Sequence, residues 1–391
     1  MNKNKYLAKR LLIFLKGAIP AFVFLFIPKV GKRIIFSSDL NCSYKNNSKF
    51  LFEYFLDKHP EKEIRYVVNC SKLRKDLSDR FGNYFIETDS LAGVFYALRA
   101  KTWVVSSLET PVGGVFLGIG RYVHHLGHGA PLKRIGLLEK YSNPLKKIYL
   151  KLIRFNFSYF FSTSELFRSA WSNCVGVNPN KVFIIGQART DQLCHPDETL
   201  ARTHMTKTPS NSNILYAPTW RPFSKTKLFP FHDLDLARLS NFLEANDCNI
   251  FLRLHPNFED MVPEEFSNSS RIKTLANSEI TDINDILGSF DLLITDYSSI
   301  YIDYLVTGNP ILFLPYDYHE YDAYVGFNIC YSEYAPGPMP KNQIEFELEL
   351  NRLLCDRLYY STERAHVNGV LNPSCRNNCQ ENADFILKQL K

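Results

Sequence analysis

Residues suited to binding an anion stand together in the stretch Asp291–Asp317 of this sequence. The apolar run Leu292–Thr295 has the length and β-branched content of a buried strand. A turn with Ser298 and Ser299 follows, and then a helical spacing that ends near Gly308. Two serines beside the free N–H groups of a helix N-terminus predict an anion site, although the same serines could simply cap the helix.

Two more predicted strands, in the first half of the chain, end in groups that could serve phosphate chemistry. His128 lies between two glycines after the predicted strand Tyr122–Leu126, where it could act as a general base or phosphate donor, or be an ordinary loop residue. Arg189 follows the predicted strand Lys181–Gly186 and is either an anion ligand or part of a surface salt bridge.

Two predicted strands in the second half carry similar groups. Asn213–Tyr216 runs into Pro218–Arg221, and Asn249–Leu254 overlaps Arg253–His255. The carboxyl ends of parallel strands meet at one edge of a sheet, which is where such sheets bind ligands. We therefore expect two imidazoles, several guanidiniums, a serine pair and a helix N-terminus in one cleft, an environment for one or two phosphates.

Several other functions are not supported by the sequence. His124 and His125 would point to opposite faces of a strand, so we expect no metal site and no required divalent cation. There is no Walker-A loop, no GxGxxG after a strand and no paired-carboxylate motif of a glycosidase. The net charge of +6 is mild and lies largely in the first 35 residues, which argues against nucleic-acid binding. We expect no cofactor.

The elements that must position these groups alternate between strands and helices along the chain. With 391 residues, this alternation predicts an α/β protein of two Rossmann-like, doubly wound domains that face each other across a cleft. We expect a first domain over residues 31–196, a polar linker over 197–212 and a second domain over 213–391.

The first 30 residues form a basic and apolar segment. Several lysines precede the apolar run Leu11–Ile27, which Lys16, Gly17 and Pro20 interrupt. The run is too broken for a good spanning helix, and no small-residue cleavage site follows it. We expect residues 1–30 to lie on the inner membrane surface; the alternative is a first helix docked on the protein.

Five motifs follow one another along the chain in an order and spacing that are typical of one protein family. They are HGAPLKRIG, GQARTDQL, YAPTWR, RLHP and TDYSSIYIDYLVTGNPILFLPYD. In this respect the chain resembles the CDP-glycerol glycerophosphotransferase family, the primases and polymerases of teichoic acids and related capsule polymers. The resemblance runs from about Ile34 to Leu387. It implies a GT-B-like architecture that binds CDP-glycerol mainly through the second domain.

Position by position, the resemblance implies a set of residues that contact the donor. They are His128, Gly129, Ala130, Pro131, Leu132, Arg189, Pro218, Thr219, Arg253, Leu254, His255, Ser298, Ser299 and Asp303. Further candidates are Asp191, Arg221 and Asp296. The sequence departs from the family pattern at Gly127, where a tryptophan is usual, and at Ala188, where a proline is usual.

The resemblance implies transfer of glycerol phosphate, or a similar polyol phosphate, from CDP-glycerol to a hydroxyl of a saccharide or lipid-linked acceptor, with release of CMP. We expect His128 as the base, with His255, Arg253 and Arg189 neutralising the diphosphate. Asp303 would accept hydrogen bonds from a donor hydroxyl. The expected location is the cytoplasmic face of the bacterial cell membrane.

Two other classes of function stay open at this point. One is a GT-B glycosyltransferase that uses a nucleotide-sugar, and the other is a non-catalytic protein that only binds ligands in its cleft. Within the favoured class, the residues do not distinguish CDP-glycerol from CDP-ribitol.

Overall fold

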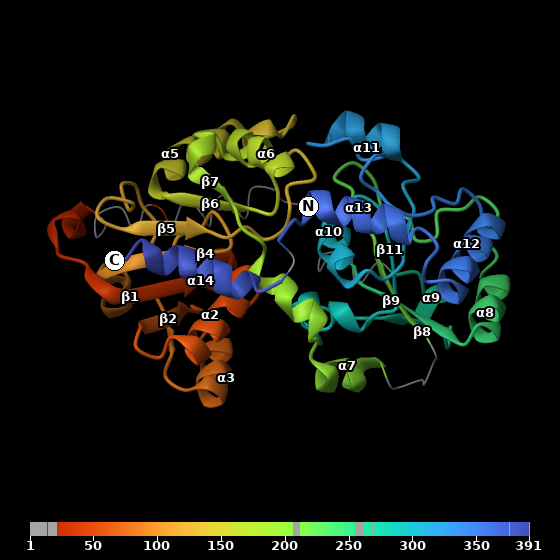
Figure 1. Cartoon of the computed structure of the whole chain (residues 1–391), viewed down its shortest axis with the longest axis horizontal. Helices are drawn as coiled ribbons and strands as arrows, with labels where there is room; N and C mark the ends of the chain where they lie inside the picture. The colour runs from red at the N-terminus through yellow and green to blue at the C-terminus, as the bar shows by residue number, and fades with distance from the viewer. Residues whose placement is uncertain are drawn as a thin grey trace. The chain divides into compact units, whose positions relative to one another are not determined.

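The computed structural model describes residues 14, 22–205, 212–254, 262–267, 269–374 and 376–390. The chain divides into two compact units. Unit 1 comprises Met1–Ala130, Ile135–Asp191 and Ser374–Lys391, and unit 2 comprises Pro131–Arg134 and Gln192–Pro373. Each unit contains a parallel sheet with helices packed on it (Figure 1).

Unit 1 contains a sheet of seven parallel strands among its described residues, in the order β3-β2-β1-β4-β5-β6-β7. The strands are β1 (Val30–Ser37), β2 (Glu63–Val67), β3 (Phe85–Ile86), β4 (Ala100–Val105), β5 (Tyr122–His125), β6 (Tyr159–Ser162) and β7 (Val182–Ile184). Such a reversal of strand order, here between β1 and β4, is typical of a Rossmann-like fold.

The helices of unit 1 bury apolar faces against this sheet. They are α2 (Asn46–Lys58), α3 (Ser71–Phe81), α4 (Leu91–Leu98), α5 (Pro144–Ile153), α6 (Glu165–Val175) and α14 (Asn378–Lys388). In the core, the ring of Phe36 on β1 lies 5.5 Å from the rings of both Phe52 and Phe55 on α2. The C-terminal helix α14 adds Ala383 and Ile386 to the same core and packs beside α2 (Figure 1).

Unit 2 repeats this plan with a five-stranded parallel sheet in the order β10-β9-β8-β11-β12, counted over its described residues. The strands are β8 (Ser212–Ala217), β9 (Cys248–Leu252), β10 (Ile272–Thr274), β11 (Leu292–Thr295) and β12 (Ile311–Phe313). All residues of β9, β11 and β12 are buried, as expected for a sheet covered on both faces.

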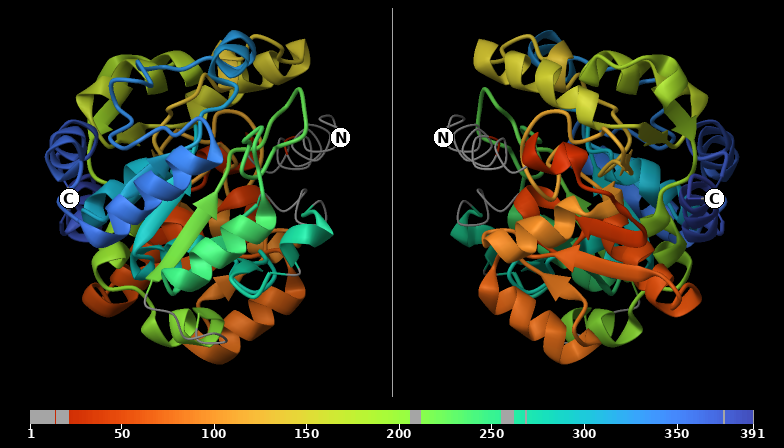
Figure 2. Two further views of the ribbon diagram at one scale, coloured as in Figure 1. Left: turned by 90° about the vertical axis from the view of Figure 1, so that its right-hand side faces the viewer. Right: turned by 90° about the vertical axis from the view of Figure 1, so that its left-hand side faces the viewer.

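The helices of unit 2 are α7 (Glu198–Met205), α8 (Leu236–Ala245), α9 (Glu264–Ser267), α10 (Ile300–Tyr304), α11 (Tyr318–Tyr324), α12 (Gln343–Cys355) and α13 (Ser361–Leu371). Asp235 and Asn342 cap α8 and α12 with their side chains. These two helices lie side by side (Figures 1 and 2), where Arg238 and Glu347 form an ion pair of 2.7 Å.

The prediction of two α/β units with parallel sheets is confirmed, but the units do not follow the expected residue ranges. Residues 374–391 belong to unit 1, whereas the prediction assigned them to a domain over 213–391. Residues 131–134 belong to unit 2. In the expected linker 197–212, residues 198–205 form the helix α7, on which Ala201 and Met205 are buried one turn apart.

Of the expected membrane-associating segment, residues 1–30, only residue 14 and residues 22–30 are among the described residues. Within it, Phe14 packs its ring against Tyr149 of α5, and residues 24–26 form a short 3-10 helix before β1 begins. Among the residues that the structure describes, no helix is both long and apolar enough to cross a membrane.

Candidate functional site

The polar groups of unit 2 gather where its strand order reverses, between the neighbouring strands β8 and β11. The chain leaves β8 into Pro218 and Thr219, and it leaves β11 into Asp296. The N–H of Thr219 donates to Oδ1 of Asp296 at 2.8 Å, and the N–H of Tyr297 donates to the same oxygen at 2.6 Å. The two strand ends are therefore joined directly at the position where parallel α/β sheets bind ligands.

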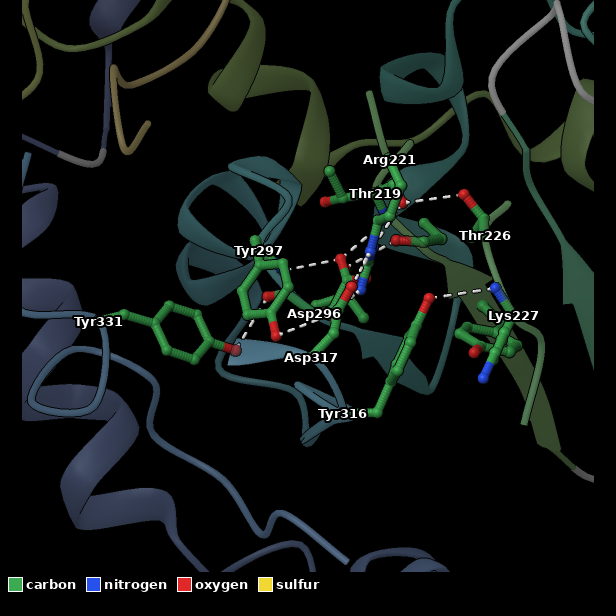
Figure 3. Close-up of polar contacts among 12 residues, drawn as sticks. Thr219, Arg221, Thr226, Lys227, Asp296, Tyr297, Tyr316, Asp317 and Tyr331 are labelled. Carbon is green, nitrogen blue, oxygen red and sulfur yellow. Dashed lines mark hydrogen bonds and ion pairs between the residues drawn. The ribbon is translucent and has the colours of Figure 1, made fainter. Parts of the chain in front are cut away.

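Arg221 lies between two carboxylates in this region (Figure 3). Its Nη1 contacts Oδ2 of Asp296 at 2.5 Å, and its Nε and Nη2 donate to the two oxygens of Asp317 at 2.8 and 2.7 Å. The Arg221 side chain is 0% exposed. Asp317 follows β12, so one guanidinium links the ends of β8, β11 and β12.

Aromatic rings enclose this cluster of charges. The guanidinium of Arg221 lies 4.7 to 5.3 Å from the ring centres of Tyr297, Tyr316 and Tyr321. The hydroxyl of Tyr331 donates to the carbonyl of Asp296 at 3.0 Å. Burial opposes the charge on Arg221, but the hydrogen bond to Asp317 and the charge of Asp296 outweigh burial and raise the pKa of Arg221.

In this structure Arg221 and Asp296 stabilise the fold of the strand-end loops. The sequence made both candidates for contact with a ligand, yet the side chain of each is almost fully buried and paired with the other. Their arrangement holds the backbone of the strand-end loops in place. Asp317, which completes the pairing, was not predicted, because the charge pattern around it resembles that of any polar turn.

The side chain of Thr219 differs from these groups. Thr219 is buried, and its hydroxyl has no hydrogen-bond partner among the described residues. A buried hydroxyl without a partner is costly in a folded protein, and a ligand could supply the missing bond. Pro218 beside it is also buried.

Ser298 and Ser299 are half-buried and lie at the start of α10, as the sequence predicted. The hydroxyl of Ser298 accepts weakly from the N–H of Ile300 at 3.4 Å, and Ser299 makes no side-chain cap. Gly308 ends the helical stretch in a left-handed conformation, which confirms the predicted stop. Asp303, on the same short helix, is 1% exposed.

Arg253 binds within its own unit. Its Nη1 and Nη2 donate to the carbonyls of Leu275 and Ile280 at 3.1 and 2.7 Å, which ties the loop after β10 to the end of β9. Leu254 is buried, and its carbonyl accepts from Asn277. His255 lies outside the described residues.

The HGAPLKRIG motif is shared between the two units. Its residues Pro131–Arg134 belong to unit 2, where Lys133 pairs in antiparallel fashion with Phe327. Asn328 donates from its backbone N–H to Leu132 at 2.9 Å, and from its side chain to the carbonyls of Pro131 and Lys133 at 2.8 and 2.9 Å. Leu132 is fully buried there.

In unit 1, His128 and Gly129 follow β5, as predicted. Gly127 has φ +74° and Gly129 has φ +143°, and a Cβ on Gly127 would stand 3.2 Å from the ring of Trp171. Glycine at position 127 thus allows a close approach to Trp171 that a side chain would obstruct. The His128 side chain is exposed and Ala130 is buried.

Asn47, at the start of α2, holds the loops of His128 and Arg189 together. Its Nδ2 donates to the carbonyls of Leu126 and Gly127, and its Oδ1 accepts from the N–H of Arg189 at 3.1 Å. The buried Arg189 in turn donates from Nη1 to the carbonyl of His128 at 3.0 Å. Arg189 therefore fixes the backbone that carries His128.

Asp191 has a structural role in the described fold. Its carboxylate accepts from the N–H groups of Asn378 and Cys379 at 2.9 and 2.7 Å and so caps the N-terminus of α14. The proposed ligand role of Asp191 has no support in this geometry.

His124 and His125 point to opposite sides of the sheet, as the sequence predicted. His124 stacks on Tyr159, with 5.0 Å between ring centres, whereas His125 packs against Phe160 and Trp171. Burial lowers the pKa of each imidazole to about 3, so both are neutral at physiological pH. Among the described residues, no group of three or more metal-ligating side chains comes together.

Asn47 and Asn328 were missed in the sequence because a lone asparagine outside a motif carries no signal of its partners. Asn47 lies at the start of α2, where an asparagine more often caps the helix. Its partners are instead 79 to 142 positions away along the chain.

The fold and these residues define a protein of the parallel α/β class, with polar strand-end loops in both units. Residues 19–378 match the family described as CDP-Glycerol:Poly(glycerophosphate) glycerophosphotransferase. The chain belongs to this family, and its residues His128, Arg189, Thr219 and Ser298 lie within the matched range.

Individual relatives are teichoic acid enzymes. The chain is 30% identical over 348 residues to a teichoic acid poly(glycerol phosphate) polymerase of Bacillus subtilis, covering 82% of this chain but only 43% of that relative. It is 27% identical over 330 residues to a teichoic acid glycerol-phosphate transferase of Staphylococcus aureus, covering 79% of this chain and 81% of the relative.

A solved structure shares the fold over the whole chain. It is a variant of the wall teichoic acid polymerase TagF soaked with CDPG, with a TM-score of 0.76 and 22% identity, and the match covers 100% of this chain and 99% of that one.

Proposed function

We propose that this protein transfers glycerol phosphate, or a similar polyol phosphate, from CDP-glycerol to a hydroxyl of a saccharide or lipid-linked acceptor in teichoic acid or capsule polymer synthesis. The match of residues 19–378 to the glycerophosphotransferase family carries this proposal. We assign the acceptor to unit 1 and the CDP-alditol donor mainly to unit 2.

The reaction would be a substitution at phosphorus. The acceptor hydroxyl attacks the phosphorus bonded to glycerol, a new P–O bond forms, and the bond to the CMP phosphate breaks. His128, exposed on a loop that Asn47 and Arg189 hold, would take the proton of the hydroxyl. The departing CMP carries the negative charge, which cationic groups and N–H donors must stabilise.

Unit 2 would bind the donor at the ends of β8 and β11. Hydrogen bonds to phosphate oxygens are offered by the hydroxyl of Thr219, which has no partner in the described part of the chain, and by the half-buried serines 298 and 299. Arg253, His255 and Asp303 complete the proposed set. Asp303 is buried, so its hydrogen bond to a donor hydroxyl requires the donor to reach the inner face of α10.

The donor can be identified by incubating the purified protein with CDP-glycerol, CDP-ribitol and UDP-sugars, together with a saccharide acceptor. We expect CMP release from a CDP-alditol, with a phosphodiester signal in the ³¹P NMR spectrum of the product. A glycosyltransferase would instead release UDP and form no phosphodiester, and a protein that only binds would release neither nucleotide.

The role of His128 is tested by His128→Ala. We expect CDP-glycerol binding to persist while turnover falls by about a hundredfold or more, because a general base contributes on that order. His232, an exposed histidine of unit 2, provides the matched control as His232→Ala. Unchanged turnover in His128→Ala would remove His128 as the base.

We also propose attachment to the membrane surface, supported by α5 as well as by the composition of residues 1–30. An apolar stripe on and beside this helix is exposed, with Leu145, Ile148, Leu152 and Phe155 all between 44% and 63% exposed. Lys147 and Lys151 lie on the same helix. An exposed apolar stripe with lysines suits a bilayer surface that contains anionic lipids.

Flotation with vesicles of phosphatidylglycerol and phosphatidylcholine tests this attachment. We expect the protein to float with mixed vesicles and Ile148→Glu/Leu152→Glu to reduce the bound fraction several-fold. The control is Leu358→Glu, which changes an exposed leucine of unit 2. Equal losses in both variants would contradict a role for α5.

A further inference from the structure

The segment Pro131–Arg134 is rigidly attached to unit 2, although most of its sequence motif belongs to unit 1. Asn328 binds three consecutive carbonyls of this segment, those of Pro131, Leu132 and Lys133. Arg134 donates from its N–H to Gly326 at 3.0 Å. Because hydrogen bonds hold the backbone on both sides of Lys133, the position from which its side chain extends is fixed.

This attachment places Lys133 near the ends of β8 and β11. Its pairing partner Phe327 packs against Tyr297, with 5.5 Å between ring centres, and Tyr297 directly follows Asp296. Lys133 also lies within the electrostatic influence of Asp296 and Arg221. The lysine is therefore part of the strand-end region of unit 2 that also contains Thr219.

The ammonium group of Lys133 makes no hydrogen bond or ion pair with another residue of the described chain, and the residue is half-buried. Asp296 cannot easily serve as its counter-ion, because both Asp296 oxygens are already used by Arg221 and by two backbone N–H groups. A partly desolvated cation without a direct partner is unfavourable, and an anionic ligand would relieve it.

We propose that Lys133 is a donor-binding residue, whose ammonium contacts the diphosphate of the nucleoside-diphosphate donor at the strand ends of unit 2. This inference rests on the proposed function for the identity of the donor. Lysine acts on phosphate as a compact point charge, and it can follow the charge that moves to CMP as the P–O bond breaks.

The electrostatics of the ligand-free site agree with this role. Burial and the charge of Arg221 lower the pKa of Lys133 to about 8, against the opposing effect of Asp296. Arg134, the next charged residue along the segment, is exposed and donates from Nε to Phe327. A bound diphosphate would favour the charged lysine, so donor affinity should fall as pH rises above about 8.

Titration calorimetry with CDP-glycerol and with CDP tests the proposal in the full-length protein. We expect Lys133→Met to weaken binding of both nucleotides by about tenfold to a hundredfold, the usual effect of losing a hydrogen bond to a charged group. Lys133→Arg should retain part of the affinity. Lys341→Met, which removes an exposed lysine of the same unit, should bind like the unaltered protein.

A stability measurement separates ligand binding from a structural role. Because folding lowers the Lys133 pKa, the charged lysine disfavours the folded state at neutral pH, and Lys133→Met should be no less stable than the unaltered protein. In the Lys133→Met variant, CDP affinity should also no longer fall as pH rises above 8.

Unchanged nucleotide affinity in a folded Lys133→Met variant overturns the proposal, and so does a lowered melting temperature with normal affinity. Failure of the proposed function would look different. The unaltered protein would then release no CMP from any CDP-alditol, while CDP affinity would still report on Lys133.

Discussion

Arg221 and Asp317 form a two-point ion pair in which Nε and Nη2 of the guanidinium donate to separate oxygens of one carboxylate, at 2.8 and 2.7 Å. The third nitrogen, Nη1, contacts Asp296. Each carboxylate follows a different strand of the unit 2 sheet. The positions of these strand-end loops relative to one another therefore depend on the Arg221 side chain.

We predict that Arg221→Lys destabilises the protein even though it keeps the charge. A lysine cannot reproduce the planar fork, and two buried carboxylates would be left poorly paired. Breaking a buried pair in this way costs about 3–5 kcal/mol, to be measured by urea denaturation. Arg352→Lys, at an exposed ion pair with Glu349, is the control and should cost less than about 1 kcal/mol. Equal losses of stability at both positions would contradict the role of Arg221 in joining Asp296 and Asp317.

Asn47→Leu should reduce both stability and turnover. The substitution leaves the buried carbonyls of Leu126 and Gly127 and the N–H of Arg189 without their partner, at a cost of about 1–3 kcal/mol for each uncompensated group. Because these bonds fix the loop of His128, we expect kcat to fall more than donor affinity changes. Asn382→Leu, another buried asparagine of unit 1, should destabilise similarly with a smaller effect on kcat.

Asp191→Ala tests whether this residue is a helix cap or a ligand. As a cap of α14, its loss should lower the free energy of unfolding by about 0.5–2 kcal/mol. The KM for CDP-glycerol should stay within about twofold, which steady-state kinetics on the folded variant would establish. A large rise in KM without loss of stability would restore Asp191 to the binding site.

The buried histidines predict a dependence of stability on pH. Folding lowers the pKa of His124 and of His125 from 6.5 to about 3, so the unfolded chain binds protons that the folded chain excludes. Above pH 6.5 the two neutral histidines do not reduce the free energy of unfolding. As pH falls from 6.5 towards 3, protonation of the unfolded chain lowers this free energy progressively. Urea denaturation at pH 7.5 and pH 5 should show this loss, and it should be smaller in His124→Phe/His125→Phe.

The sequence allowed the prediction of most strands because buried strands are short apolar runs that end in polar residues. Leu292–Thr295 was predicted with its observed bounds, and the loop of His128 was placed correctly after β5. The spacing of residues 282–287 is compatible with a single helix, yet this part of the chain forms two short 3-10 turns, Ile283–Asp285 and Leu287–Ser289. Local spacing does not distinguish these two outcomes.

Long-range partners could not be predicted. The apolar face of α14 indicates that it packs on something, but helical periodicity cannot show that the partner is α2 rather than a nearer helix. In the same way, the sequence around Arg221 shows a cation at a strand end and does not show the two carboxylates, 75 and 96 positions later, that occupy it.

The assignment of residues 374–391 to unit 1 has a practical consequence for dissecting the protein. Neither unit can be produced by cutting the gene at a single point between its halves. A truncation after Pro373 would remove α14 from a unit whose first strand begins at Val30. The core residues that Ala383 and Ile386 cover would then be exposed to solvent. Separate expression of unit 1 would require the C-terminal segment to be joined to Asp191 through a designed connection.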